Sequence, residues 1–175
     1  MANIQIVYLI YGPLGSGKST YARKLSAEKN AIRFAIDEWM HILFGDDQPA
    51  KKDATWMGWT MTRVARCETR IWLTSMQILA SGRDVVLDLG LMREKDRARL
   101  AALVDASGHQ VSFCFVDADR GLRQQRVLQR NIEQGDTYSF DVTPAMFDFM
   151  EMYFEQPTEK ELSRSIRISK EIKHG

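Results

Sequence analysis

The sequence has few cysteines, almost no net charge and no motif of clustered metal ligands. Two cysteines, Cys67 and Cys114, occur in 175 residues, far apart and without C-x-x-C spacing. This excludes a disulfide scaffold and a zinc site of the usual kind, and it predicts two buried, reduced thiols. The 24 basic and 23 acidic residues give a net charge of +1, so the chain as a whole is no polyanion binder. A local basic groove stays open as an alternative.

Long hydrophobic runs are also missing. No window approaches the roughly 18 apolar residues that a membrane-spanning helix requires. The N-terminal "MANIQIVYLIYG" has no basic leader and runs directly into glycine-rich sequence, which does not fit a signal peptide. We therefore expect a cytoplasmic protein without a membrane partner.

Hydrophobic periodicity predicts strands that alternate with helices. We expect strands over 4–10, 31–37, 84–90, 110–118 and 165–169, helices over 19–29, 38–45, 59–80, 93–106, 120–134 and 144–153, and loops over 46–58, 135–143 and 154–161. This order is typical of an α/β protein with a parallel sheet and helices on both faces. The length suits a single domain, 1–175.

The most specific motif follows the first apolar segment. Residues 12–19, "GPLGSGKS", match G-x-x-x-x-G-K-[ST], the phosphate-binding P-loop known as Walker A. Glycines let backbone N–H groups converge on an anion, and the next helix directs its positive end there. Lys18 is expected to reach the β- and γ-phosphates of ATP, and the Ser19 hydroxyl to bind Mg²⁺. The predicted nucleotide-binding residues are Gly12, Gly15, Ser16, Gly17, Lys18, Ser19, Thr20 and, further along the chain, Arg123.

Two aspartates follow predicted strands. Asp37 and Asp88 each stand where a strand ends, and ligands of open parallel sheets bind at that edge. Asp37 is assigned to orient and deprotonate an acceptor hydroxyl, with a helix N-cap as a compatible structural role. Asp88 is assigned to the metal, with contact to the acceptor as the open alternative. Glu38 is a weaker candidate, and we interpret it as an acidic residue in the first turn of a helix, where its charge interacts favourably with the helix dipole.

A helix rich in arginine lies near the C-terminal third. Arg123, Arg126 and Arg130 share one face of the predicted helix, with Arg120 one turn earlier. A solvated basic face is the ordinary reading of this spacing. Phosphoryl transfer, however, requires cations over the transferring group, and guanidinium suits that task. We predict that Arg126 and Arg130 act in catalysis from a lid over about 119–143.

Four tryptophans lie between the second and third predicted strands. Trp39 and Trp72 fit core positions, whereas Trp56 and Trp59 flank a glycine and could instead stack on an acceptor. Arg63, Arg66 and Arg70 lie on one side of the following helix, either solvated or in contact with an anionic acceptor.

These motifs together resemble those of the small P-loop kinases, often catalogued as AAA-type ATP-binding proteins and related to the zeta toxin, chloramphenicol phosphotransferase, polynucleotide kinase and gluconate kinase families. The resemblance is carried by "GPLGSGKST", "FAIDEW", "VVLDLGLMREKDR", "FVDADRGLRQQRVLQRN" and "FEQPTEKE". It implies an ATP-dependent kinase with the three-layer P-loop NTPase fold, a five-stranded parallel sheet and an arginine-bearing lid. Asp37 stands where those families keep the acid that activates a hydroxyl. Phe154, Glu155 and Pro157 match a late F-E-x-P signature, interpreted as packing at the base of the lid.

The leading hypothesis is thus a kinase that moves the γ-phosphoryl group of Mg-ATP to a small hydroxyl-bearing acceptor. A regulatory nucleotide-binding ATPase and a polynucleotide 5′-hydroxyl kinase are the alternatives. Polynucleotide kinases carry a further basic residue soon after the acid, where this chain has Glu38, Trp39 and Met40. Nothing in the sequence requires more than a monomer or a weak dimer.

Overall fold

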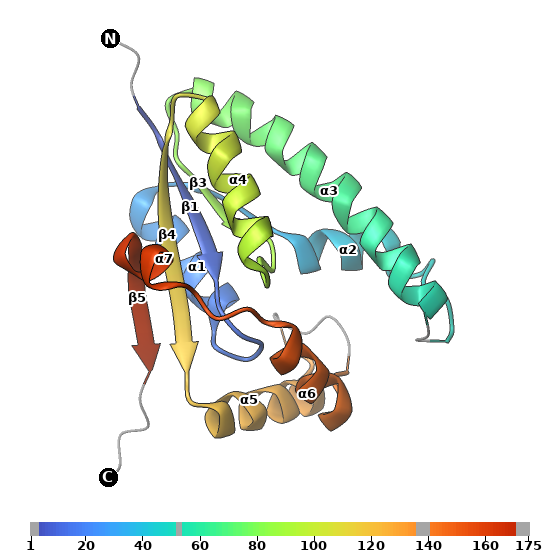
Figure 1. The fold of residues 1–175 in the computed structure, drawn as a ribbon. Helices are drawn as coiled ribbons and strands as arrows, with labels where there is room; N and C mark the ends of the chain where they lie inside the picture. The colour runs from blue at the N-terminus through green and yellow to red at the C-terminus, as the bar shows by residue number, and fades with distance from the viewer. Residues whose placement is uncertain (1–3, 52–53, 136–140, 171–175) are drawn as a thin grey trace.

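The computed structural model describes residues 4–51, 54–135 and 141–170. Five parallel strands form one sheet in the order β2-β3-β1-β4-β5. The strands are β1 (Ile6–Tyr11), β2 (Ile32–Ala35), β3 (Val85–Asp88), β4 (Gln110–Ala118) and β5 (Ser165–Lys170). Their carboxyl ends share one edge, toward the bottom of Figure 1. The predicted five-stranded parallel sheet is confirmed.

Seven helices accompany the sheet in the described part of the chain. They are α1 (Lys18–Lys29), α2 (Ile36–Phe44), α3 (Ala54–Ala80), α4 (Glu94–Ala106), α5 (Arg120–Glu133), α6 (Pro144–Tyr153) and α7 (Glu159–Ser163). Helix α1 covers one face and α3 and α4 the other, while α5 and α6 lie beyond the carboxyl end of β4 (Figure 1). None of these helices combines the length and the apolar character needed to span a bilayer.

The central strand β1 is buried on both sides, which explains its unbroken apolar sequence. Tyr8 and Ile10 pack toward α1, where they join Ala22 and Leu25. Val7, Leu9 and Tyr11 point the other way, into the larger cluster formed with α3 and α4. Both cysteines are free and buried, as predicted. This packing on both faces holds β1 in place, and the glycine-rich turn begins at the carboxyl end of that strand.

Three expected boundaries were wrong. Helix α3 begins at Ala54, five residues before the expected start at Trp59 and inside the expected loop over 46–58. Strand β2 ends at Ala35 and passes directly into α2, so Asp37 lies in the first turn of a helix, not at the end of a strand. Part of the expected loop over 154–161 belongs to α7, which Thr158 and Glu161 begin with a reciprocal capping box.

Candidate functional site

The glycine-rich turn occupies residues 12–17, between the end of β1 and the start of α1. Gly15 and Gly17 have φ values of 77° and 97°, which side chains other than glycine rarely adopt. A Cβ on Gly12 would stand 2.0 Å from the Val116 carbonyl oxygen, and one on Gly15 would stand 2.6 Å from the Arg123 carbonyl oxygen. The turn therefore needs glycine, both for its backbone shape and for its close approach to β4 and α5.

A cavity of about 910 Å³ opens above this turn. Its walls come from the turn and the start of α1, from α2, from the end of β3 and from α5. The predicted residues that line it are Gly15, Gly17, Lys18, Ser19, Thr20, Asp37, Asp88, Arg126 and Arg130. Tertiary structure thus brings most of the predicted site into one cavity. Gly12 and Ser16 belong to the turn but do not line the cavity, and Arg123 lies beneath the turn.

Lys18 is the first residue of α1 and sits at the floor of the cavity. Its Nζ donates a hydrogen bond of 2.8 Å to the Pro13 carbonyl oxygen, which folds the side chain back over the turn. Burial lowers the pKa of Lys18, and the charges of Asp88 and Asp37 oppose that shift. A phosphate arriving here would meet a partly desolvated cation whose nearest charge partners are carboxylates.

The two carboxylates differ in their surroundings. Asp37 is exposed to the cavity, while Asp88, the last residue of β3, is buried. The enclosing walls remove hydration from Asp37 and, together with the negative Asp88, raise its pKa, against the influence of Lys18 and Arg130. Burial also raises the pKa of Asp88, opposed by Lys18 and by a hydrogen bond with Ser19. Two carboxylates that share one lysine are thereby held closer to their protonated forms than isolated aspartates.

The Ser19–Asp88 contact is the part of the site that fits Mg²⁺. A hydroxyl and a carboxylate, both oxygen donors, meet at the edge of the phosphate-binding turn. Among the described residues, no three His, Cys, Asp or Glu side chains gather as a metal cage. Mg²⁺ commonly takes one or two protein oxygens and completes its shell with substrate phosphates and water. The donor set therefore fits this ion as a companion of a bound nucleotide.

Arg126 and Arg130 reach the cavity from α5. The Arg126 Nη1 lies 3.4 Å from the Ser16 carbonyl oxygen and 3.9 Å from where a Cβ on Gly17 would stand. Arg130 lies one turn further along the same face and acts electrostatically on both Lys18 and Asp37. The expected lid over 119–143 includes α5, while residues 136–140 lie outside the described residues. That this segment moves as a lid stays a prediction.

Arg123 has a different place from its two neighbours. Its guanidinium is buried and donates to the carbonyl oxygens of Ala118 and Leu14, at 2.9 and 3.2 Å. It also forms a two-pronged ion pair with Glu151 of α6, at 2.6 and 2.7 Å. These contacts occupy the side chain beneath the turn. It supports the expected nucleotide site from behind and does not line the cavity.

Several lining residues were not expected from the sequence. Gly90 follows β3, and one face of α5 contributes Leu122, Gln125 and Gln129. The signal for the α5 residues was present, since they share a helical face with Arg126, but apolar and amide side chains on such a face are not distinctive by themselves. Trp56 and Trp59 do not line this cavity, and Trp59 instead lies under Arg63, whose Cζ is 3.9 Å from the ring centre.

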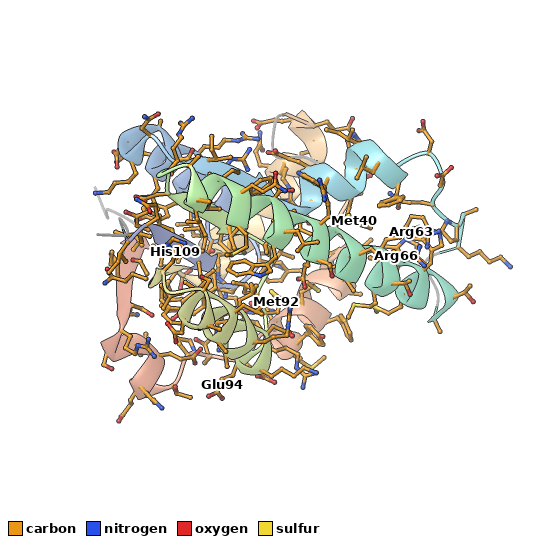
Figure 2. The ribbon with its side chains drawn as sticks, turned by 90° about the horizontal axis from the view of Figure 1, so that it is seen from above. Met40, Arg63, Arg66, Met92, Glu94 and His109 are labelled. Atoms are coloured by element: carbon orange, nitrogen blue, oxygen red, sulfur yellow. The ribbon has the colours of Figure 1, made fainter. Side chains whose placement is uncertain are left out.

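Arg63 also lies 5.5 Å from the ring centre of Phe44 and so joins α3 to the end of α2. Figure 2 shows Arg63 and Arg66 on α3, with Met40 on the neighbouring α2. Trp39 and Trp72 pack against the larger core cluster, as expected. Of the late signature, Phe154 is buried in that core, and the Glu155 carboxylate accepts hydrogen bonds from the Glu94 backbone N–H and from Arg93. Through the Glu155 carboxylate, the signature therefore stabilises the start of α4.

The arrangement defines a class of protein: a P-loop NTPase fold of the kinase type, with a glycine-rich turn at the carboxyl edge of a five-stranded parallel sheet. The family model AAA_33, described as an AAA domain, matches residues 7–157, and the chain belongs to that family. The predicted relationship to small P-loop kinases is confirmed. A sequence search among curated proteins gave no significant match.

Several solved structures share this fold. A candidate kinase from Chloroflexus aurantiacus J-10-fl has a TM-score of 0.70 at 16% identity, over 95% of this chain and 88% of that one. Chaetomium thermophilum Kti12 in complex with ADP-AlF3 has a TM-score of 0.65 at 13% identity, over 97% and 90%. A gluconokinase from Sinorhizobium meliloti 1021 has a TM-score of 0.58 at 16% identity, over 96% and 83%. At such identities the similarity establishes the fold alone.

Proposed function

We propose that the protein is an ATP-dependent kinase that transfers the γ-phosphoryl group of Mg-ATP to a hydroxyl of a small acceptor. One observation carries the proposal. A single cavity of about 910 Å³ is lined by the phosphate-binding turn, by two carboxylates and by two arginines. Phosphoryl transfer needs these three kinds of group together: an anion cradle, a group to orient the attacking hydroxyl, and cations over the transferring phosphoryl.

The donor side is the turn with the N-terminus of α1. The backbone N–H groups there and the Lys18 ammonium would hold the β- and γ-phosphates, and Arg126 approaches from the opposite wall. Ser19 and Asp88 would hold Mg²⁺, which would neutralise part of the negative charge of the nucleotide phosphates. The location of Thr20 at the cavity rim is compatible with contact to a phosphate further from the reacting centre.

The chemical step forms one P–O bond and breaks another. The acceptor oxygen attacks the γ-phosphorus, the bond to the β–γ bridging oxygen breaks, and ADP leaves. Asp37 would orient the acceptor hydroxyl and take its proton, a role its raised pKa favours because a more basic carboxylate holds a proton better. Lys18, Arg126 and Arg130 would spread the negative charge of the loose transition state.

A nucleotide-dependent switch would need the turn but neither Asp37 in the cavity nor two arginines facing it. This favours a kinase over the regulatory ATPase. A polynucleotide 5′-hydroxyl kinase is the remaining alternative, and a panel of acceptors distinguishes it from a kinase of small molecules.

The test incubates the protein with Mg²⁺ and γ-labelled ATP against nucleosides, 5′-hydroxyl oligonucleotides, sugars, nucleotide-sugars and hydroxylated antibiotics. We expect label to move to one class, and expect the Asp37→Asn variant to lose that transfer. Slow release of free phosphate that depends neither on an acceptor nor on Asp37 would contradict the proposal and favour the regulatory ATPase.

A further inference from the structure

A cluster of three charged side chains lies just outside the cavity. The Arg33 Nη2 of β2 donates to both carboxylate oxygens of Glu38, at 2.7 and 2.8 Å, and the Arg23 Nη2 of α1 donates to one of them at 3.0 Å. Glu38 belongs to the first turn of α2 and directly follows Asp37. One carboxylate therefore ties together three separate elements beside the proposed catalytic aspartate.

Apart from this cluster, apolar packing of Ile36 and Trp39 holds the start of α2. Helix α2 begins immediately after β2, and its N-cap residue, Ala35, provides no side-chain hydrogen bond to the helix. Ile36 is buried in the larger core cluster and anchors one side of the first turn. Asp37 opens onto the cavity. Ion pairs of Glu38 and apolar packing of Ile36 thus both hold the first turn of α2, and Asp37 lies between these two residues in the sequence.

The opposite charges of Arg33 and Glu38 strengthen the contact between β2 and α2. The Arg33 side chain is only 16% exposed, and its Nη1 is buried with no hydrogen-bond partner in the described part of the chain. Burial by itself would raise the pKa of Glu38, but the hydrogen bonds from Arg33 and Arg23 outweigh it and place the pKa below its ordinary value. Glu38 is therefore ionised at neutral pH and is the counter-charge that the enclosed Arg33 requires.

We propose that Glu38, held by Arg33 and Arg23, is a positioning residue that fixes the first turn of α2 so that the Asp37 carboxylate faces the acceptor hydroxyl. The inference rests on the proposed kinase function and adds to it three residues that do not line the cavity. A displacement of about 1 Å at a reacting group can cost about a hundredfold in rate. Loss of the cluster should therefore act on the transfer step and spare nucleotide binding.

The test compares Glu38→Gln and Arg33→Met with their double variant. We expect each single variant to lower kcat by about tenfold, and the double variant by about the same factor, because the two residues act through one contact. The Kd for ATP should stay within about twofold, since the donor side is untouched. Glu38→Asp, which keeps the charge, should recover part of the lost rate.

A matched control is the Arg99–Glu68 pair, which joins α4 to α3 at 2.7 Å and does not line the cavity. Glu68→Gln should leave kcat unchanged. A loss in the double variant equal to the product of the two single losses, or an equal loss of kcat and ATP affinity in Glu38→Gln, would overturn the positioning role.

A second measurement, hydrogen exchange, tests the positioning role of Glu38 without any acceptor. Hydrogen exchange of the backbone amides at residues 36–40 should become about tenfold faster in Glu38→Gln, but not in Glu68→Gln. Unchanged exchange would contradict this inference even if the protein proves to be a kinase. A wild-type protein that phosphorylates no acceptor, but shows the faster exchange in the variant, would remove the kinase proposal and leave the structural part of the inference standing.

Discussion

Arg123 and Glu151 form a two-pronged ion pair, with contacts of 2.6 and 2.7 Å, directly beneath the phosphate-binding turn. The same guanidinium donates to the Leu14 carbonyl oxygen within the turn. One side chain of α5 therefore links α6 to the segment proposed to hold phosphate. Because Arg126 and Arg130 extend from the same helix, the pair also determines where the cations of the cavity stand.

Arg123→Met should destabilise the fold and weaken nucleotide binding. Removing one partner of a largely buried pair leaves the other charge unpaired, at a cost of about 3 kcal/mol. Chemical denaturation and ATP titration measure the two effects. Arg120→Met is the comparison on the same helix, since Arg120 is half exposed, pairs with the exposed Asp148 at 2.6 Å and approaches Glu151 only at 3.6 Å; it should change stability by less than about 1 kcal/mol. Equal losses in both variants would contradict the role given to Arg123.

Two glycines should respond in opposite ways to alanine. Gly12→Ala places a Cβ 2.0 Å from the Val116 carbonyl oxygen, so the turn must shift, and we expect a loss of about 2 kcal/mol or more. Gly58 lies inside α3 with open space around it, and Gly58→Ala should stabilise the helix by about 0.5–1 kcal/mol. Thermal unfolding of both variants checks the prediction. Stabilisation by Gly12→Ala would show that the turn does not approach β4 so closely.

The dependence of ATP turnover on Mg²⁺ concentration should change when Ser19 is replaced by alanine. If its hydroxyl and Asp88 hold Mg²⁺, Ser19→Ala should raise the half-saturating Mg²⁺ concentration by about tenfold or more. ATP turnover measured against Mg²⁺ concentration provides the readout. Ser26→Ala removes a hydroxyl from the same helix that donates to the Arg23 carbonyl oxygen and does not line the cavity, and it should leave the curve unchanged. An unchanged curve for Ser19→Ala would remove this residue from the metal site.

Stability should fall with acid partly through Glu161. Arg97 is fully buried and pairs with Glu161 through Nε and Nη2, at 2.5 and 3.1 Å. Burial is the largest influence on Glu161 and raises its pKa, but the hydrogen bonds from Arg97 and Thr158 and the charge of Arg97 together outweigh it, so the pKa lies below its ordinary value. A lowered pKa in the folded state stabilises the protein above the unfolded-state value, and the gain disappears as pH falls through the folded-state value.

Glu161→Gln should therefore be less stable than the wild type by about 3 kcal/mol at neutral pH. The gap should narrow as the pH falls below about 4.3, the ordinary glutamate value. Urea unfolding across that range measures it. A gap that stays constant into strong acid would mean that the charge of Glu161 is not what stabilises the pair.

The sequence predicted the glycine-rich turn, the parallel sheet and nine of the nineteen residues that line the cavity, because these depend on local patterns. Gly12 to Ser19 form one contiguous motif, and β1 is apolar on both faces. The separate role of Arg123 could not be predicted this way. Helical spacing groups it with Arg126 and Arg130, and only the packing of α6 against α5 distinguishes it.

The contacts of Glu38 also could not be predicted from local sequence patterns. Its sequence position suggests only a favourable charge at a helix start, while its two arginine partners come from α1 and β2. The start of α3 was misplaced for a local reason, because Gly58 and the polar loop residues before it favour a turn. Packing of Trp59 against Phe44 of α2 helps to hold that first part of α3 as helix instead.

The central claim is that Asp37 acts on the acceptor hydroxyl and not on ATP. The most direct measurement is the rate of phosphoryl transfer from γ-labelled ATP to the acceptor, together with the Kd for ATP, in the wild type and in Asp37→Asn. The account predicts a loss in kcat of about a hundredfold or more, with the Kd unchanged within about twofold. Transfer at the wild-type rate, or a Kd weakened by the same factor as kcat, would contradict it.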